Sequence, residues 1–246
     1  MRTAVSSLLT VCLVVGIATV SRAFEDNFIF HYSFDGGSGD TVEDSGGLGN
    51  DGMLMDGASR VTKGKFNDAI EFDGGQAHIE TVLDVPEFDF TMALWIQTDN
   101  PAVGIYSVLD GAAGAGGHDR HFYLQGGNIC FRVWQGAGWC TSTQVDDGDW
   151  HHIALVTETG PGQTAYVDGE EVGVFAYDHS DFDWQKLVWI GFSNDGGVDY
   201  FEGLIDEVAY LDTPLTQEEV QQLMAPLAVQ PRDKVATTWA GIRSGF

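Results

Sequence analysis

Two adjacent histidines, His151 and His152, are the first candidates for chemistry, because imidazole nitrogens bind metal ions and transfer protons near neutral pH. Apolar residues alternate through this segment, which predicts a β-strand. Neighbouring side chains of a strand point to opposite faces, so the two rings cannot chelate one ion together. A serine nucleophile is not indicated either, because Ser107, Ser142 and Ser193 lack the G-x-S-x-G context of a hydrolase elbow.

Two cysteines remain outside the N-terminal apolar segment, Cys130 and Cys140, on either side of residues 135–138. In an exported protein such a pair most simply closes a hairpin disulfide, which for a short loop stabilises by about 2–3 kcal/mol. The alternatives are a reactive thiol pair or two metal ligands, but no CxxC spacing or neighbouring histidine favours them. The sequence therefore predicts a Cys130–Cys140 disulfide.

A binding face is predicted from the alternation in residues 121–134. Positions 122, 124, 131 and 133 are apolar and would face a core. The opposite, exposed surface of the sheet would then carry Tyr123, Gln125, Arg132 and Trp134. Aromatic rings beside an arginine and an amide suit sugars, whose C–H faces pack on rings and whose hydroxyls bond polar groups.

The rim of this face would include Trp139, inside the disulfide hairpin, Asp119 and Arg120, in the glycine-rich loop before the strand at 121–125, and Trp184, in the loop at residues 179–184. The alternative is that the large aromatic side chains pack beneath loops, as such rings usually do. Both interpretations stay open for Trp134, whereas Trp95 and Trp189 are interpreted as packed.

These residues need a sheet to hold them, and its pattern is clearest in residues 150–173. Residues 153 and 155 fall on one face and residues 152, 154 and 156 on the other. A second strand at 164–167 ends in Asp168-Gly169, a dipeptide that favours a tight hairpin. Further strands are expected at 28–34, 69–72, 77–80, 90–97, 105–109, 187–192 and 204–211, with hairpin turns at 73–76 and 126–128. Short strands at this spacing predict an all-β, two-sheet antiparallel sandwich.

One short helix is expected near the C-terminus. Thr216 is its N-cap and Glu219 completes a capping box, while residues 220, 223 and 224 give it an apolar side and Pro226 ends it. Residues 226–246 then form a tail with three basic residues and one acidic residue. This tail is either a disordered end or a short recognition peptide.

The first 23 residues have the pattern of a signal peptide, with a basic start, an apolar run and small residues before the expected cleavage site. This predicts export to the extracellular space, the periplasm or the cell surface, and no later segment is apolar enough to span a membrane. Cleavage after residue 23 leaves 9 basic and 37 acidic residues, a formal charge of −28. Such a charge argues against a nucleic-acid partner and would favour a divalent cation, although it also simply keeps a protein soluble.

Several phrases in order resemble the laminin-G-like, concanavalin A-like domains. They are HYSFDGG, DSGGLGNDGML, GKFNDAIEFDGGQAHIE and FDFTMALWIQ in the first half, and DGDWHHIALV, TAYVDGEEVG, LVWIGFSNDGG and FEGLIDEVAYLDTPLTQEEV in the second. The resemblance covers residues 28–224 and implies a jelly roll, so residues 24–225 are expected to form one such domain. It does not fix a function, because these domains include sugar-binding modules, adhesion domains and appendages of enzymes.

The resemblance also implies a structural calcium ion where the first strand ends beside the last. Carried over by motif, its ligands would be Asp35, Asp44, Asn50 and Asp206. Calcium prefers six to eight oxygen ligands, and it would explain how the glycine-rich segment 35–52, poor in apolar residues, stays ordered. The alternative is that these are turn residues and acceptors of backbone hydrogen bonds.

Catalysis is not predicted. Related β-glucanases carry Glu-x-Asp-x-x-Glu on one strand, and the nearest match, at residues 71–76, lacks the second glutamate. The favoured hypothesis is an exported, non-catalytic module that binds a glycan or polysaccharide or mediates adhesion, stabilised by calcium and one disulfide. The second is a protein-interaction or structural surface domain without a sugar site.

Overall fold

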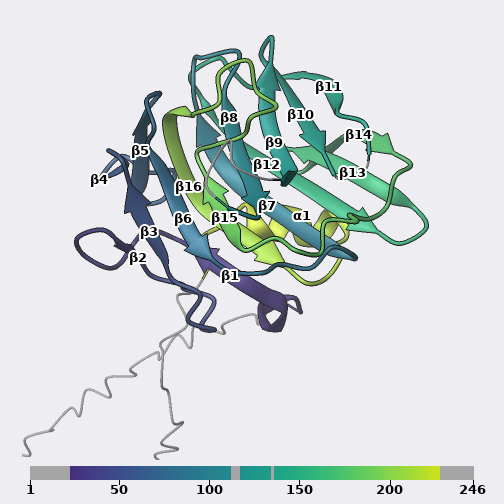
Figure 1. Ribbon diagram of the computed structural model, residues 1–246, viewed down its shortest axis with the longest axis horizontal. Coiled ribbons are helices and arrows are strands. Elements are labelled where there is room, and N and C mark those ends of the chain that lie inside the picture. Colours follow the sequence, from purple (N-terminus) through teal and green to yellow (C-terminus); the bar gives the residue numbers. More distant parts are fainter. Residues whose placement is uncertain (1–22, 112–116, 134–135, 228–246) are drawn as a thin grey trace, which may run out of the picture.

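The computed structural model describes residues 23–111, 117–133 and 136–227, so nearly all of the predicted signal peptide and of the predicted tail lies outside the described residues. The described chain forms two eight-stranded antiparallel sheets, called here sheet A and sheet B (Figure 1). The predicted all-β, two-sheet jelly-roll sandwich with one C-terminal helix is therefore confirmed. A short 3-10 helix, Glu25–Asn27, precedes the first strand.

Sheet A has the order β14-β13-β12-β7-β16-β5-β4, with β1 paired to the end of β16. Its strands, in chain order, are β1 (Phe28–Tyr32), β4 (Ser59–Val61), β5 (Ala69–Asp73), β7 (Phe90–Gln97), β12 (Trp150–Glu158), β13 (Gly162–Val167), β14 (Glu170–Phe175) and β16 (Glu202–Leu211). The β13–β14 hairpin turns at Asp168 and Gly169, both with positive φ, as their sequence predicts.

Sheet B has the order β11-β10-β9-β8-β15-β6-β3-β2. Its strands, in chain order, are β2 (Thr41–Val42), β3 (Gly52–Met55), β6 (His78–Val82), β8 (Gly104–Leu109), β9 (His118–Gln125), β10 (Asn128–Arg132), β11 (Trp139–Gln144) and β15 (Leu187–Ile190). The hairpin predicted at 126–128 joins β9 to β10.

The core between the sheets follows from the alternation of apolar residues along each strand. Ile153 and Leu155 of sheet A and Phe122 and Phe131 of sheet B all belong to one buried cluster. Ala154 points the other way and belongs to a second cluster on the outer face of sheet A. A shift of one residue in register would exchange these faces, so the pattern fixes which side of each strand is buried.

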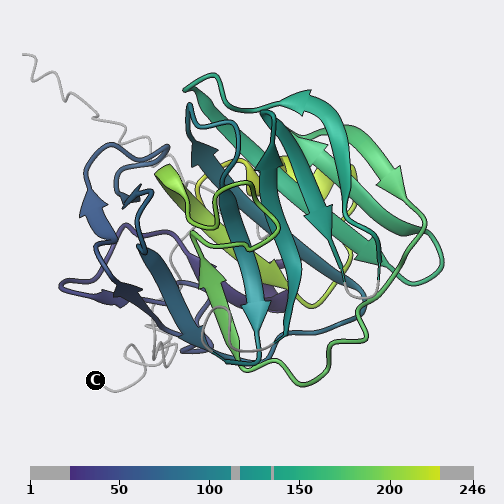
Figure 2. The ribbon, with the colours of Figure 1, turned by 45° about the horizontal axis from the view of Figure 1, so that its top comes forward.

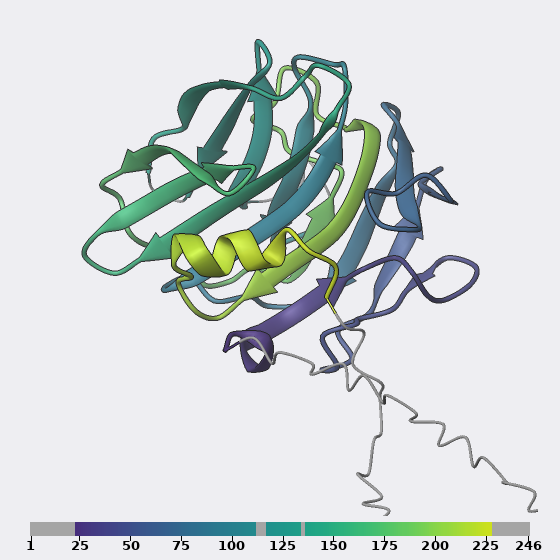
Figure 3. The same cartoon turned by 180° about the vertical axis from the view of Figure 1, so that it is seen from behind.

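Helix α1 (Gln217–Leu223) covers part of the outer face of sheet A (Figure 3). Thr216 accepts a hydrogen bond from the Glu219 backbone, and the Glu219 side chain bonds back to the N-cap, so the predicted capping box is formed. Val220 and Leu223 are buried against the outward-facing residues of β7, β12 and β16. No helix in the described residues is long and apolar enough to cross a membrane.

The hairpin predicted at residues 73–76 is wrong. The strand before this turn, β5, pairs with β4 and β16 in sheet A, whereas the strand after it, β6, pairs with β3 and β15 in sheet B. Gly74 has a positive φ and permits the sharp turn, but a turn dipeptide does not determine which strands then pair. The strands β2, β3 and β4 are also absent from the sequence-based expectation, which gives no bounds for β11 and β14, the strands that follow two of the predicted hairpin bends.

Candidate ligand-binding face

The outer face of sheet B is the surface that the sequence singles out, and no helix lies across it in the view of Figure 1. The register pairs Tyr123 with Cys130 and His121 with Arg132, which places all four side chains on this face. Gln125 is exposed, the Arg132 side chain is 27% exposed, and Tyr123 is buried. Three of the six predicted ligand-binding residues, Tyr123, Gln125 and Arg132, therefore lie on one surface.

The loop between β15 and β16 adds residues that the sequence did not single out as ligands. Asp195 Oδ2 lies 2.7 Å from Arg132 Nε. Asn194 Nδ2 lies 3.2 Å from His118 Nδ1, and Ser193 Oγ lies 2.8 Å from His121 Nδ1. We call His118, His121, Arg132, Asn194 and Asp195 the polar cluster of sheet B. Its members come from β9, β10 and the loop, so no sequence window contains it.

Burial and charge set the protonation of this cluster. Burial, and then the nearby Arg132 charge, hold the pKa of His121 well below its usual value, and the same two causes lower the pKa of His118. Arg132 Nη2 donates to His121 Nε2 at 2.9 Å, so the His121 proton is assigned to Nδ1, facing Ser193. Burial raises the pKa of Asp195, although Arg132 opposes the shift. At neutral pH the cluster offers neutral imidazoles beside one ion pair.

Arg120 is not on the predicted rim. It lies within β9 and is fully buried, with a left-handed φ of 49° at an irregularity of the strand. Its Nη2 donates to Glu87 Oε1 at 3.3 Å and to the carbonyl of Phe182 at 3.2 Å. The reversed local twist turns the side chain inward, so Arg120 joins two loops and does not face a ligand from the sheet surface.

Trp139 is not on the outer face either. It pairs with Phe131 across β10 and β11, so both rings point toward the interior, and Trp139 Nε1 donates to Gln163 Oε1 at 2.9 Å. Its ring also stacks on Phe175, at 5.8 Å between centroids. The tryptophan thus closes one side of the sandwich. Trp134, the sixth predicted ligand-binding residue, lies outside the described residues.

An apolar row crosses the same face beside the polar cluster. The registers place Val82, Leu187, Leu109 and His118 side by side on neighbouring strands. Val82 is 80% exposed. Trp189 lies one row further on but is nearly buried, because His78 stacks on it at 3.8 Å. The interpretation of Trp189 as a packed side chain is confirmed, and the same holds for Trp95.

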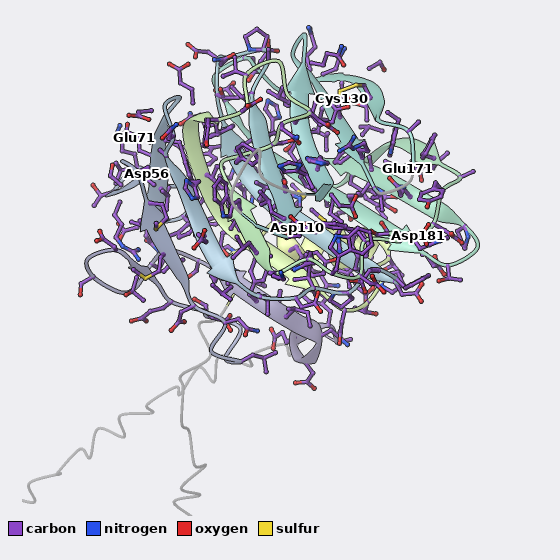
Figure 4. All side chains as sticks on the ribbon, in the orientation of Figure 1. Asp56, Glu71, Asp110, Cys130, Glu171 and Asp181 are labelled. Atoms are coloured by element: carbon purple, nitrogen blue, oxygen red, sulfur yellow. A yellow bond between two sulfur atoms is a disulfide. The ribbon has the colours of Figure 1, made fainter. Side chains whose placement is uncertain are left out.

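The predicted disulfide joins Cys130 and Cys140, which lie directly opposite each other in the β10–β11 pair. Figure 4 shows it at the end of the molecule away from Glu71 and Asp56. The cross-link fixes β11, an edge strand that pairs only with β10, next to the binding face.

Asp44 and Asn50 lie together at the end of β1. The Asp44 carboxylate accepts hydrogen bonds from the backbone N–H groups of four residues, at 2.9–3.1 Å: His31, Gly46, Gly49 and Asn50. The Asn50 side chain donates to the carbonyl of Ile29. These bonds organise the glycine-rich segment from within, which is the alternative that the sequence left open for these two residues.

Asp35 and Asp206 lie near a different segment, residues 64–68. Asp35 accepts from the Asn67 side chain and the Asp68 backbone, while Asp206 accepts from the Phe66 backbone at 3.0 Å. Asp35 also lines a cavity of about 90 Å³ with Glu43 and two serines. Within residues 23–111, 117–133 and 136–227, no three His, Cys, Asp or Glu side chains gather closely enough to hold a metal ion.

Asp206 is nevertheless an unusual carboxylate. Burial is the largest cause that raises its pKa to about 8, and the neighbouring Glu207 and Asp35 charges add to the shift. A cation beside this group would remove that penalty, because it favours the charged form.

A further group of carboxylates was missed from the sequence. Asp73 pairs directly with Glu202 across β5 and β16, and both line a groove of about 370 Å³ with Glu71. Asn100 donates to Glu202 at 2.9 Å, and Lys63 lies 3.4 Å from Glu71. Glu202 lies far along the chain from residues 71–73, so a search for acids within one strand could not pair them.

The two adjacent histidines point apart, as the strand prediction requires. His151 contacts Asp147 and Asp168, and hydrogen bonds to these two acids raise its pKa although burial, the largest single cause, opposes them. His152 is buried beside Trp95, and burial lowers its pKa to about 4. They form no shared site.

Two stacked antiparallel sheets, one covered by a helix and one carrying an open polar face, define a lectin-like jelly-roll domain. A family model described as the concanavalin A-like lectin/glucanases superfamily matches residues 73–221, more than half of the chain. The protein belongs to this family. The predicted laminin-G-like, concanavalin A-like resemblance is thereby confirmed. No curated protein sequence matches the chain.

Solved structures of similar fold are binding domains of low sequence identity. The binding domain of Paraclostridial Mosquitocidal Protein 1 has a TM-score of 0.64 and 17% identity, with 82% of this chain and 52% of that one covered. Domain 4 of the arabinanase AbnA from Geobacillus stearothermophilus, solved with arabinotriose, has a TM-score of 0.61 and 19% identity, covering 81% and 98%. The binding domain of botulinum neurotoxin DC, solved with rat synaptotagmin II, has a TM-score of 0.60 and 10% identity, covering 82% and 52%. The chain thus spans about half the length of the two toxin binding domains.

Proposed function

We propose that this protein is an exported, non-catalytic module that binds a neutral glycan on the outer face of sheet B. The observation that carries the proposal is the polar cluster, in which an arginine–aspartate ion pair lies beside histidine and asparagine side chains on the outer face of sheet B, where the Arg132 side chain is 27% exposed. Sugar hydroxyls both donate and accept hydrogen bonds, so a carboxylate and a guanidinium held 2.7 Å apart can bond adjacent hydroxyls.

The apolar row beside the cluster completes the proposed site. Val82, which is 80% exposed, and the partly exposed Leu187 offer a surface on which the C–H face of a sugar ring can pack, above the buried Leu109. The strong negative charge of the chain repels sulfated or carboxylated polymers, which favours a neutral ligand. The AbnA domain supports this choice, since a domain of the same fold was solved in complex with an oligosaccharide, arabinotriose.

Protein recognition is the second candidate. Val82 and Met53, which is 47% exposed, are large apolar side chains on the same sheet. Such residues favour a protein partner. The toxin domain solved with synaptotagmin supports this alternative.

Calcium remains part of the proposal, centred on Asp206 and Asp35. The buried Asp206 carboxylate fits a cation, because its raised pKa reflects a charge with too little compensation. Asp44 fits less well, since its oxygens already accept four backbone hydrogen bonds. A bound calcium ion would supply stability and not chemistry, and Asp35 and Asp206 would hold it.

The proposal of a non-catalytic role has a specific competitor in the groove of Glu71, Asp73 and Glu202, because paired carboxylates cleave glycosidic bonds. Incubation of the protein with a panel of polysaccharides should release no reducing ends. Hydrolysis that disappears in Glu202→Gln would overturn the non-catalytic role.

A glycan array followed by calorimetry tests the binding proposal. Arg132→Ala should weaken binding of the best glycan about tenfold, as expected for loss of a charged hydrogen bond. Lys63→Ala is the control, because Lys63 is 67% exposed and lies between β4 and β5 of sheet A, away from the proposed site. Equal glycan affinity of the two variants would rule out the polar cluster as the binding site. If no glycan on the array binds, the protein-binding alternative is favoured.

A further inference from the structure

A third surface lies on the edge of the sandwich, where residues 176–186 run between β14 and β15 (Figure 2). The His179 ring stacks on Phe88, with centroids 5.0 Å apart and an interplanar angle of 7°, and on Tyr177 at 5.1 Å and 25°. Phe88 is 52% exposed, and Trp184 of the same segment is 49% exposed. Neither the core nor the face of sheet B accounts for these exposed rings.

Two carboxylates contact the His179 ring. Asp178 Oδ1 lies 2.7 Å from His179 Nδ1, and Asp181 Oδ1 lies 3.4 Å from His179 Nε2. Asp181 is half exposed. Aromatic faces and carboxylates together attract an organic cation, because the ring quadrupole and the negative charges act in the same direction. A neutral sugar would gain only the ring contact and hydroxyl bonds.

A buried network holds this surface in place. Arg120, with no solvent exposure, bonds through one nitrogen both to Glu87, next to Phe88, and to the carbonyl of Phe182, whose ring packs on Trp184 at 4.6 Å. The Ser180 backbone N–H donates to the carbonyl of Glu87. Burial of the Arg120 charge costs free energy of folding. Its bonds to the loops of Glu87 and Phe182 hold these two loops together and thereby position Phe88 and Trp184.

We propose that Phe88, His179 and Trp184, with Asp178 and Asp181, form an interaction surface for a basic peptide segment of a partner protein. An arginine or lysine side chain of that segment packs against the Phe88 ring, and its charge pairs with Asp181. Arg120 is the positioning residue of this surface. This surface is separate from the polar cluster of sheet B. Arg132→Ala should therefore leave binding of the basic peptide unchanged even though it weakens glycan binding.

Calorimetric titration of the full chain with a capped triarginine peptide tests the proposal. Phe88→Ala should weaken binding about threefold and Phe88→Ala with Trp184→Ala about tenfold, from the strength of exposed cation–π contacts. Val174→Ala is the matched control, because it removes an exposed apolar side chain of edge strand β14, outside the proposed sites. None of these variants changes the charge of the chain, so general attraction of a cation to an acidic protein is the same in all.

Two outcomes would overturn the proposal. Equal affinity of the double variant and Val174→Ala would leave only non-specific electrostatic attraction, which falls steeply with salt. If Phe88→Ala lost binding of a neutral oligosaccharide but kept binding of triarginine, the rings would belong to a sugar site and not to a peptide site. Phe88 and Trp184 are both about half exposed, so their variants should keep the thermal stability of the wild type, measured in parallel.

Discussion

The outer faces of the two sheets differ in what covers them. On sheet A, Val220 and Leu223 of α1 bury Ala93, Ala154 and neighbouring side chains in a second apolar cluster (Figure 3). On sheet B, within the described residues, the loop between β15 and β16 brings Asp195 to Arg132, while Val82 stays exposed. One face is therefore closed by packing, and the other is left open with polar groups in fixed positions.

This difference predicts that the covered face contributes mainly to the free energy of unfolding and the open face mainly to the free energy of ligand binding. Apolar burial under α1 stabilises the fold, since each fully buried aliphatic side chain contributes about 1.5–3 kcal/mol. The polar cluster of sheet B stabilises little, because partly exposed ion pairs contribute about 0–1 kcal/mol. Substitutions on sheet A should therefore change stability, and those on sheet B should change binding.

The largest effect is expected from Leu223→Ala, which leaves a cavity between α1 and sheet A. The free energy of unfolding should fall by about 2–4 kcal/mol in urea denaturation, with glycan affinity unchanged. Val82→Ala, on the open face, should change stability by less than about 0.5 kcal/mol. Similar losses in the two variants would contradict the distinction between the faces.

The buried His152 makes sheet A sensitive to acid. Its pKa is about 4 in the folded protein and near 6.5 when unfolded, so the unfolded chain binds more protons between these values. Stability should fall as pH drops from about 6.5 to 4, by up to about 3 kcal/mol from this group.

The neighbouring His151 provides a control of opposite sign. Its pKa is raised in the folded protein, so its contribution is fully present below the unfolded pKa and is lost as pH rises through the folded pKa. Thermal denaturation between pH 4 and 8 should give a shallower acid decline for His152→Gln and a steeper one for His151→Gln. The same slope in both variants would be inconsistent with the assigned burial.

Asp206→Asn separates the calcium proposal from a purely structural role. In chelator the two proteins should differ little in stability, because the substitution removes the cost of a buried carboxylate but its amide nitrogen replaces one of the two oxygens that accept the Phe66 and Glu207 backbone N–H groups. In calcium at about 100 times the dissociation constant the wild type should gain about 2.7 kcal/mol and the variant much less. A wild-type melting temperature that does not respond to calcium would argue against the ion.

Asp195→Asn should affect the open face alone. Loss of the ion pair with Arg132 should weaken glycan binding about tenfold and lower stability by less than about 1 kcal/mol. Glu171→Gln is the control, because Glu171 is an exposed acid of edge strand β14. The pair of variants is compared by calorimetry and urea denaturation.

The smallest effect is expected at the cap of the covering helix. Thr216→Ala removes the side-chain acceptor of the capping box and should cost about 1 kcal/mol of stability, while Thr216→Ser should cost little. Glycan affinity should not change in either variant. A capping substitution that altered affinity would connect the two faces, contrary to their separation.

Much of the sandwich could be predicted from the sequence, because alternation is a local property. Phe122, Phe131, Ile153 and Leu155 face the core as their spacing indicates. Failures arose where pairing or curvature depends on distant segments. The turn at residues 73–76 crosses between the sheets. The left-handed backbone of Arg120, within β9, turns its own side chain inward.

The candidate site was predictable only in part, for the same reason. Tyr123, Gln125 and Arg132 lie on one face because their strands alternate regularly. Asp195 and Asn194 come from a glycine-rich loop without periodicity, and only tertiary packing brings them to His118 and Arg132. Trp139 carries no sign in the sequence that its ring points inward, since the register with Phe131 decides it.

The central claim is that the open face of sheet B binds a glycan. Its most direct test is a ¹H–¹⁵N NMR titration of the protein with the best ligand from the glycan array. Saturable shifts should concentrate at Tyr123, Arg132, Asn194 and Asp195, with none under α1. Shifts confined to the groove of Glu71, Asp73 and Glu202, or to the outer face of sheet A, would contradict the account.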